Sequence, residues 1–158
     1  MEKDILAGET RELEILEFKA GGNSYGINVS DVREILPYNT KPTPIPNSHP
    51  FIEGIIMPRD FLIPIINLTS SLRLTTTDED KNEMLIVTSL NDLNIAIHVD
   101  SVNGIHRTYN TELKKPGKKL TTTAKNAVAA ILEIDDRKIE VLELRNLFNE
   151  INPETILG

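Results

Sequence analysis

The chain of 158 residues is long enough for one compact domain or two very small ones, and its 39% of apolar residues is typical of a folded protein. The absence of cysteine excludes disulfide bonds, a thiol nucleophile and cysteine-based zinc or iron–sulfur sites. With 24 acidic and 17 basic residues the formal net charge is −7, so we expect the chain to repel nucleic acid and anionic membranes. No apolar run approaches the ~20 residues of a membrane helix, and we expect a protein of the reducing cytoplasm.

The distribution of apolar residues predicts a mainly β fold, because short runs rich in Ile and Val alternate with turn residues. Near the start of the chain, residues 16–20 and 25–29 alternate between apolar and polar side chains around a Gly-Gly turn, which is typical of a β-hairpin. Ser30 is a good N-cap, so we expect a short helical turn at 30–35.

Closely spaced prolines exclude a helix over 39–50 and predict extended, polyproline-like backbone there. Residues 51–68 are then expected to form two strands joined by a turn at 59–60, followed by at most one short helix within 69–74. Threonines and charged residues make 75–82 the best candidate for a linker.

The second half of the chain is expected to contain two further hairpins and a closing helix. These are strands 84–90 and 95–99 with a turn at Asn91 and Asp92, a hairpin over 127–144 with a turn at Asp135 and Asp136, and a helix at 144–151 that ends before Pro153.

An internal repeat relates the two halves of the chain. Residues 25–35 match 95–105 at an offset of 70, with four identical aliphatic residues, and residues 51–68 match 127–144 at an offset of 76. The offset changes in the connecting segment, which is 106–126 in the second half, where insertions are tolerated. The repeat predicts two similar small β-subdomains.

Residues suited to catalysis or metal binding are sparse. His49, His98 and His106 lack the partner spacing of a known catalytic or metal site, and His98 with Asp100 on one strand face is only a weak two-ligand pattern. The sequence contains no glycine-rich phosphate loop and no serine nucleophile elbow. We therefore expect no catalytic residue, no cofactor and no metal, and predict that the protein is not an enzyme.

Binding to other proteins is the remaining hypothesis. The run from Lys114 to Lys119 carries four lysines around a Pro-Gly turn, and is either a soluble turn or a contact for an acidic partner. Apolar residues outside the aliphatic strands are candidates for a groove between the subdomains and equally for the core: Val32, Ile35, Leu36, Ile45 and Phe51.

Several short motifs occur in the order found in the CheW domain family of bacterial chemotaxis, and the chain resembles this family over about residues 12–150. It resembles most closely the N-terminal CheW-like domain of the CheV coupling proteins, because 5–18 and 149–155 resemble the CheV leader and the join to its receiver domain. The shared motifs are Leu16-Glu17-Phe18, Tyr25-Gly26-Ile27-Asn28-Val29, Val32-Arg33-Glu34-Ile35, Thr43-Pro44-Ile45-Pro46, Gly54-Ile55-Ile56 and Ile63-Pro64-Ile65-Ile66-Asn67-Leu68.

The resemblance implies two interleaved, five-stranded SH3-like β-barrels around a shared hydrophobic core, with short helices including a C-terminal one. It divides the chain into an N-terminal leader (1–12), the CheW-like domain (13–150) and the end of a linker (151–158). CheV proteins continue into a receiver domain, whose doubly wound pattern these residues do not contain. We therefore expect the chain to be the N-terminal part of a longer protein.

In function, the resemblance implies a cytoplasmic adaptor that is associated with membrane-bound chemoreceptor arrays and links the receptors to the CheA histidine kinase. The expected partners are the cytoplasmic tip of a methyl-accepting chemoreceptor and the regulatory domain of the kinase, with no nucleic acid and no insertion into the membrane. Two alternatives stay open. One is a competitor of CheW that occupies receptor or kinase sites and damps the kinase, and the other is a small ligand-binding β-barrel.

Carried over by position, the resemblance implies a receptor- and kinase-binding site at Val32, Glu34, Ile35, Gly54 and Arg59. The first three belong to a Val-x-Glu-Ile motif, and Gly54 matches a glycine near the kinase contact. Arg59 matches the arginine of an Arg-Gly turn, in which Asp60 here replaces glycine. Because Asp adopts positive φ less readily than Gly, we expect this turn to depart from the family's.

Overall fold

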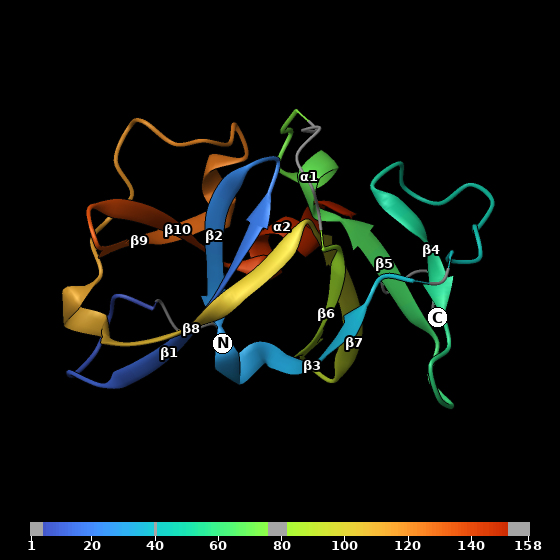
Figure 1. Cartoon of the computed structure of the whole chain (residues 1–158), viewed down its shortest axis with the longest axis horizontal. Coiled ribbons are helices and arrows are strands. Elements are labelled where there is room, and N and C mark those ends of the chain that lie inside the picture. Colours follow the sequence, from blue (N-terminus) through green and yellow to red (C-terminus); the bar gives the residue numbers. More distant parts are fainter. Residues whose placement is uncertain (1–4, 40, 76–81, 152–158) are drawn as a thin grey trace.

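The fold is mainly β, with ten strands in two five-stranded sheets, in a computed structural model that describes residues 5–39, 41–75 and 82–151 (Figure 1). The elements are β1 (Glu12–Ala20), β2 (Asn23–Asn28), η1 (Val29–Asp31), β3 (Val32–Pro37), β4 (Ile52–Ile56), β5 (Ile63–Asn67), α1 (Leu68–Ser71), β6 (Met84–Leu90), β7 (Leu93–Val99), β8 (Ser101–Tyr109), η2 (Asn110–Glu112), η3 (Lys125–Ala127), β9 (Val128–Ile134), β10 (Arg137–Leu142) and α2 (Leu144–Ile151).

Each sheet is assembled from both halves of the chain. The order β8-β1-β2-β10-β9 defines the first barrel and β3-β6-β7-β5-β4 the second, on the left and right of Figure 1. The repeat offsets relate each strand in the order β3-β6-β7-β5-β4 to the strand at the same place in the order β8-β1-β2-β10-β9. The register agrees as well, because Ile65 pairs with Ala96 as Val141 pairs with Gly26. The predicted repeat is therefore present, and its two units exchange strands.

Three hydrophobic clusters account for the core. One fills the interior of the first barrel, with members on β1, β9 and β10, and a second fills the interior of the second barrel, with members on β5, β6 and β7. The largest lies between the barrels and takes in the buried face of α2, which is Leu144, Leu147, Phe148 and Ile151. These clusters and the two sheets confirm the expected pair of SH3-like barrels around a shared core, although within the described residues no pairing joins β8 to β9 or β3 to β4.

The hairpin turns follow the sequence prediction. Residues 21–22, 91–92 and 135–136 all have positive φ between 50° and 81°, as two-residue type I′ turns require, and Gly, Asn and Asp adopt this conformation most readily. At 30–35 the prediction was wrong. Only the 3₁₀ turn η1 forms there, and from Val32 onward the chain pairs with β6, because backbone pairing with a neighbouring strand and the β propensity of Val32 and Ile35 outweigh a weak capping preference. The segment placed in a loop after Ile105 also continues as strand β8 to Tyr109.

Every pairing that involves an edge strand contains one extra residue. The register shifts place Asn103 in β8, Arg33 in β3, Glu53 in β4 and Ala129 in β9 outside the regular pairing, at equivalent points of the repeat. Such β-bulges increase twist and re-aim the side chain of the extra residue. The bulges therefore bend both sheets toward barrels. They also re-aim the side chains of Arg33 and Glu53, which contact Phe61 and His98, respectively.

A buried carboxylate closes one end of the first barrel. Glu17 of β1 is 2% exposed, and its oxygens accept hydrogen bonds from Arg137 Nη2 at 2.9 Å and from His106 Nε2 at 2.7 Å. The hydrogen bond from Arg137 is the largest cause that lowers the pKa of Glu17, and burial opposes it. Together with the hydrogen bond from His106, it lowers this pKa from 4.5 to about 2. The ion pair ties β1 to β8 and to the β9–β10 hairpin.

Glu17→Gln should lower the free energy of unfolding at pH 7 by about 2 kcal/mol, because a buried charged hydrogen bond is lost. Since the folded pKa lies below the unfolded one, this stabilisation is complete above pH 4.5 and is lost as the pH falls toward 2. Urea denaturation at several pH values measures it. The control is Glu14→Gln on the same strand, whose exposed pair with Arg107 spans 3.8 Å and should contribute less than about 0.5 kcal/mol. Equal effects of the two variants would contradict the assignment.

Candidate functional site

The second barrel is open between its two edge strands, β3 and β4. Leu36 and Pro37 of β3 face Ile55 and Ile56 of β4 across an open groove of about 430 Å³, with Leu85 of β6 also in its lining. Asn39, Lys41, Thr43, Met57, Pro58 and Leu62 complete the lining. A mostly apolar groove of this size is large enough to enclose a small ligand or part of a protein segment.

An ion pair joins the two edges of this opening. Arg59, in the loop between β4 and β5, hydrogen-bonds to the Glu34 carboxylate on β3, and their side chains are 58% and 24% exposed. Beside it, the bulge residue Arg33 places its guanidinium 5.1 Å from the ring centre of Phe61. The structure thus brings together Glu34 and Arg59, which lie far apart in the sequence, and does so at the surface.

Exposed apolar side chains lie next to both partners of the ion pair along the chain. Ile35 on β3 is 38% exposed, and Met57, Phe61 and Leu62 of the β4–β5 loop are between 47% and 60% exposed. Large exposed apolar side chains that gather at one place mark an interaction surface. The three loop residues were not predicted as site residues, because apolar residues beside a strand are as easily assigned to the core. The one available indication was their position around Pro58 and Asp60, which are typical turn residues and therefore place their neighbours at the surface.

The other proposed site residues have packing roles. Val32 is half-buried and packs against the central cluster. Gly54 has φ of 153°, and a β-carbon at this position would overlap the carbonyl oxygen of Thr43, whose backbone exchanges hydrogen bonds of 2.9 and 2.8 Å with Ile55. Gly54 therefore permits the close approach that forms one wall of the groove.

The replacement of glycine by Asp60 does not strain its turn. Among the described residues with positive φ, neither Arg59 nor Asp60 occurs, and 57–62 forms a bent loop rather than a two-residue turn. Position 60 is therefore not left-handed in this chain, and the departure of this turn from the family's stays a prediction. Arg59 is free to reach Glu34.

A polar cluster fixes the other wall of the groove. His98 of β7 contacts Glu53 through Nδ1 at 2.5 Å and Glu83 through Nε2 at 3.2 Å. Its ring stacks on Tyr38 at 3.8 Å between centroids, and the Tyr38 hydroxyl donates to Glu53 at 2.7 Å. Glu53 is the bulge residue of β4, so the bulge aims it at His98. The cluster holds Tyr38, where the chain leaves β3, against β4 and β6.

The charges of this cluster support one another. Burial opposes the charge on His98, but the hydrogen bonds and charges of Glu53 and Glu83 outweigh it and raise the pKa of His98. Burial likewise disfavours the Glu53 carboxylate, yet the hydrogen bonds from His98 and Tyr38 lower its pKa. The expectation from the sequence that His98 is an ordinary half-buried histidine missed these partners, which come from distant strands.

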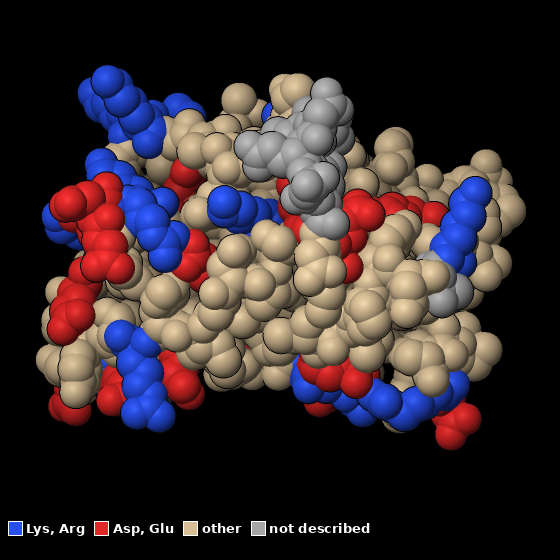
Figure 2. Space-filling view, in the orientation of Figure 1, with Lys and Arg blue, Asp and Glu red and all other residues tan. Residues whose placement is uncertain are grey.

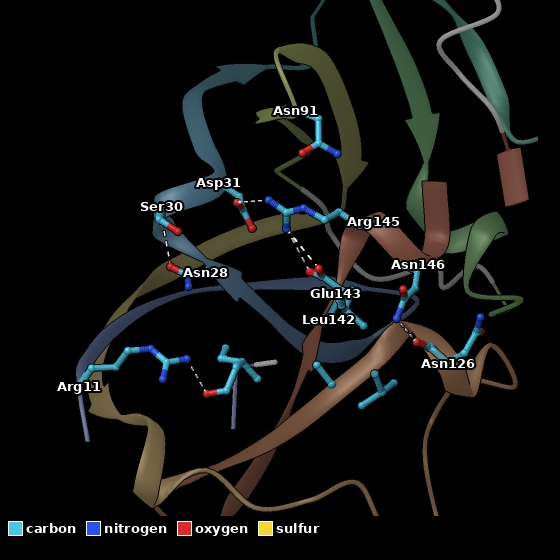
Figure 3. A pocket seen from close by; sticks show the side chains of 13 residues that line it. Arg11, Asn28, Ser30, Asp31, Asn91, Asn126, Leu142, Glu143, Arg145 and Asn146 are labelled. Carbon is cyan, nitrogen blue, oxygen red and sulfur yellow. Dashed lines mark hydrogen bonds and ion pairs between the residues drawn. The ribbon is translucent and has the colours of Figure 1, made fainter. Parts of the chain in front are cut away.

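A second, polar pocket of about 780 Å³ lies between the barrels (Figure 3). In Figure 3, Arg145 at the start of α2 points to Asp31 of η1 and to Glu143, at 3.3 and 3.2 Å, so it ties the two halves together. Arg11 hydrogen-bonds to the carbonyl oxygens of Ile5 and Ala7 at 3.1 and 2.5 Å. Because these arginines are engaged within the protein, the pocket is better explained as a structural junction than as a ligand site.

The basic run is held at both ends. The backbone of Lys114 pairs with Ile131, and Thr121 binds the Glu140 carboxylate through its amide and hydroxyl. In Figure 2, basic side chains gather at the upper left, over the segment coloured orange in Figure 1, whereas much of the middle of this face is uncharged. The loop is thus an ordered, exposed basic projection, and both interpretations from the sequence stay open.

In the described ranges no three His, Asp or Glu side chains are grouped so as to hold a metal ion. No helix of the described chain is long and apolar enough to cross a membrane. The arrangement at the second barrel is instead suited to contact with another macromolecule, since it combines an apolar groove with an exposed ion pair.

Comparison with known proteins identifies the fold family. A family model described as CheW-like domain matches residues 14–152. The chain belongs to the CheW-like domain family. A protein of Rhizobium etli named probable chemotaxis protein CheW is 30% identical over 142 residues, which are 89% of this chain and 90% of that protein. The crystal structure of scaffolding protein TtCheW from Thermoanaerobacter tengcongensis superposes with a TM-score of 0.79 at 26% identity, covering 87% of this chain and 93% of that one.

These comparisons confirm the family resemblance and the fold predicted from it. The CheV3 chemotaxis protein of Helicobacter pylori is also similar, at 30% identity over 105 residues, which are 61% of this chain and 33% of that protein. A closer likeness to CheV than to CheW therefore stays a prediction. The proposed linker at 151–158 lies, apart from Ile151, outside the described residues.

Gly54→Ala should destabilise the fold by at least about 2 kcal/mol, because the added methyl group meets backbone and φ lies where almost only glycine is found. Chemical denaturation measures the change. Gly117→Ala is the matched control, since nothing lies within 4 Å of the new β-carbon and little change is expected. A stability of Gly54→Ala within about 0.5 kcal/mol of the native chain would show that the wall at Thr43 is easily displaced.

The stabilisation by His98 should decline with rising pH. Because its folded pKa lies above the unfolded value of 6.5, the contribution is complete below pH 6.5 and is lost as the pH rises through the folded pKa. The difference in unfolding free energy between the native chain and His98→Gln should shrink accordingly. NMR titration of the His98 ring gives the midpoint directly, and a midpoint at or below 6.5 would disprove the charged cluster.

Proposed function

We propose that this protein is a chemotaxis adaptor that couples methyl-accepting chemoreceptors to the CheA histidine kinase through the second barrel. Membership of the CheW-like family supports the coupling role, and a structurally similar relative is described as a scaffolding protein. The observation that carries the proposal is the groove between β3 and β4, with the Glu34–Arg59 pair and exposed Ile35, Met57, Phe61 and Leu62 around it.

This surface has the composition of a transient protein interface. Apolar side chains at its centre supply the free energy of association when they are desolvated, and charged groups at its rim give orientation. The exposed ion pair contributes little to folding, because a pair in water is worth less than about 1 kcal/mol. Glu34 and Arg59 are therefore available for a partner at small cost to stability, and Ile35 lies beside them on β3.

Val32 and Gly54 serve the same surface indirectly in this proposal. Val32 begins β3 against the central core, and Gly54 lets the segment at Thr43 approach β4. Both act as supports for the groove, whereas Glu34, Ile35 and Arg59 make contact with a partner. The kinase regulatory domain and the cytoplasmic tip of a receptor are the proposed partners, and the proposed location is the cytoplasmic receptor array.

The test is calorimetric titration of the chain with the isolated regulatory domain of the cognate kinase, and separately with a receptor cytoplasmic fragment. Saturable binding of both partners in the micromolar range is expected, as for transient signalling contacts. Arg59→Ala should weaken binding of at least one partner about tenfold and lower the midpoint of thermal unfolding by less than about 3 °C. Arg107→Ala, which removes an exposed arginine from the first barrel, should leave both affinities unchanged.

Other outcomes would change the conclusion. Binding of the receptor fragment alone favours the alternative in which the protein competes with CheW and damps the kinase. Binding of neither partner refutes the adaptor function. Equal losses for Arg59→Ala and Arg107→Ala would place the interface elsewhere.

A further inference from the structure

The first barrel has the same opening between its edge strands as the second, but there the chain itself covers it. The leader, residues 5–11, precedes β1, and its Ile5 and Leu6 are half-buried against the apolar cluster inside the first barrel. The Asn110 side chain donates to the carbonyl oxygens of Ala7 and Glu9 at 3.4 and 3.1 Å, and its Oδ1 accepts from the Arg11 amide at 2.8 Å. The leader is therefore pinned just beyond the end of β8.

The leader also reaches the opposite edge of this opening. Ile5 lines the polar pocket together with Val128 and Ala129 of β9, the other edge strand of the first barrel. Two adjacent aliphatic residues in a turn thus pack against the interior of the first barrel, and one of them, Ile5, also lies in the pocket lined by the start of β9. Burial of such a pair contributes a few kcal/mol, which is enough to hold a short segment.

The repeat shows that the groove of the second barrel is the equivalent place. Three residues that line the groove are Leu85, Ile56 and Pro58. Their equivalents in the repeat are Ile15, Leu132 and Ile134, respectively. All three equivalents belong to, or pack against, the apolar cluster that the leader contacts. The isolated pairing of Thr43 with Ile55 beside the groove likewise corresponds to that of Lys114 with Ile131. The openings match, yet among the described residues only the first is covered.

The charge beside the groove restricts what can enter it. Lys41 lies in the lining and is exposed, and within the described chain it has no ion pair, whereas Arg59 at the rim is partnered by Glu34. A free ammonium group beside an apolar groove favours a segment that carries a carboxylate next to its aliphatic residues. The sequence at the start of the leader has this pattern, since Asp4 directly precedes Ile5 and Leu6.

We propose that the groove of the second barrel binds two adjacent aliphatic side chains of a short segment of a partner protein, as the first barrel binds Ile5 and Leu6 of its own leader, and that an acidic residue next to them pairs with Lys41. The proposal rests on the proposed function for its partner, since the groove is the surface assigned there to docking. It adds the form of the docked element, which is a short non-helical segment rather than a helix face or a small molecule.

The first experiment needs no partner protein. The isotope-labelled chain is titrated with a capped peptide of its own residues 4–9, Asp-Ile-Leu-Ala-Gly-Glu, and backbone amide shifts are followed by NMR. Saturable shifts at Ile55, Ile56 and Leu62 are expected, with a Kd on the order of 1 mM. A control peptide with both aliphatic residues replaced by serine should bind at least about tenfold more weakly. Replacing the peptide's Asp by Asn should weaken binding to the native chain but not to Lys41→Ser.

Three outcomes overturn the proposal. The first is that millimolar peptide causes no shifts in the groove, and the second is that the serine peptide binds as tightly as the native peptide. The third is that shifts are confined to the first barrel around Leu132, which would mean that the peptide only exchanges with the leader. The variant Leu62→Ser provides a second, independent test. Leu62 is 47% exposed, so Leu62→Ser should leave the fold intact and weaken binding of the kinase regulatory domain at least about fivefold.

The matched control is Lys138→Ser, at the equivalent position of the first barrel, which should not change the affinity. If the kinase domain does not bind the native chain, the proposed function fails while the peptide result stands by itself. If the kinase domain binds equally well to Leu62→Ser, the adaptor function survives and the docking of this partner through the groove is refuted.

Discussion

Four strand pairings hold the two halves of the chain together: the parallel pairs β2–β10 and β5–β7, and the antiparallel pairs β1–β8 and β3–β6. Each joins a strand from one half of the chain to a strand from the other, so neither barrel can be completed by one half alone. The central cluster between the barrels depends on the same exchange, because it draws residues from both sheets. Pairings between residues so far apart in sequence also predict slow folding, in milliseconds to seconds rather than microseconds.

The candidate site is a consequence of this arrangement. Each exchanged sheet ends in two edge strands that approach one another without pairing, and the space between them is a groove in the second barrel. Side chains of the edge strands, and of the segments next to them, fix the positions of the two sides of the groove. The Glu34–Arg59 pair joins β3 to the β4–β5 loop, and the cluster around His98 holds the chain after β3 against β4. The groove is thus built from segments that meet only when both halves have folded.

The sequence was sufficient to predict those features that depend on local patterns. Aliphatic alternation and the residues at 21–22, 91–92 and 135–136 determine hairpins within a few residues, and the repeat was visible in the spacing of Ile and Val. The helical turn expected at 30–35 failed because pairing of Val32 with β6 depends on a strand about fifty residues away. Glu34 and Arg59 were proposed from the family resemblance, but their contact was not predictable, because neither local sequence nor composition specifies which loop reaches an edge strand. His98 looked ordinary for the same reason, since Tyr38, Glu53 and Glu83 reach it from three other segments.

The four edge bulges have a further consequence for how the protein behaves in a crowded cell. A long, flat edge strand invites another chain to add itself by backbone hydrogen bonding, and this is a common route to fibrous aggregation. Here β3, β4, β8 and β9 each carry an extra residue near their start, which twists the edge and shortens the regular run of free amide and carbonyl groups. The molecule can therefore present open sheet edges and exposed apolar side chains to specific partners while resisting uncontrolled self-association.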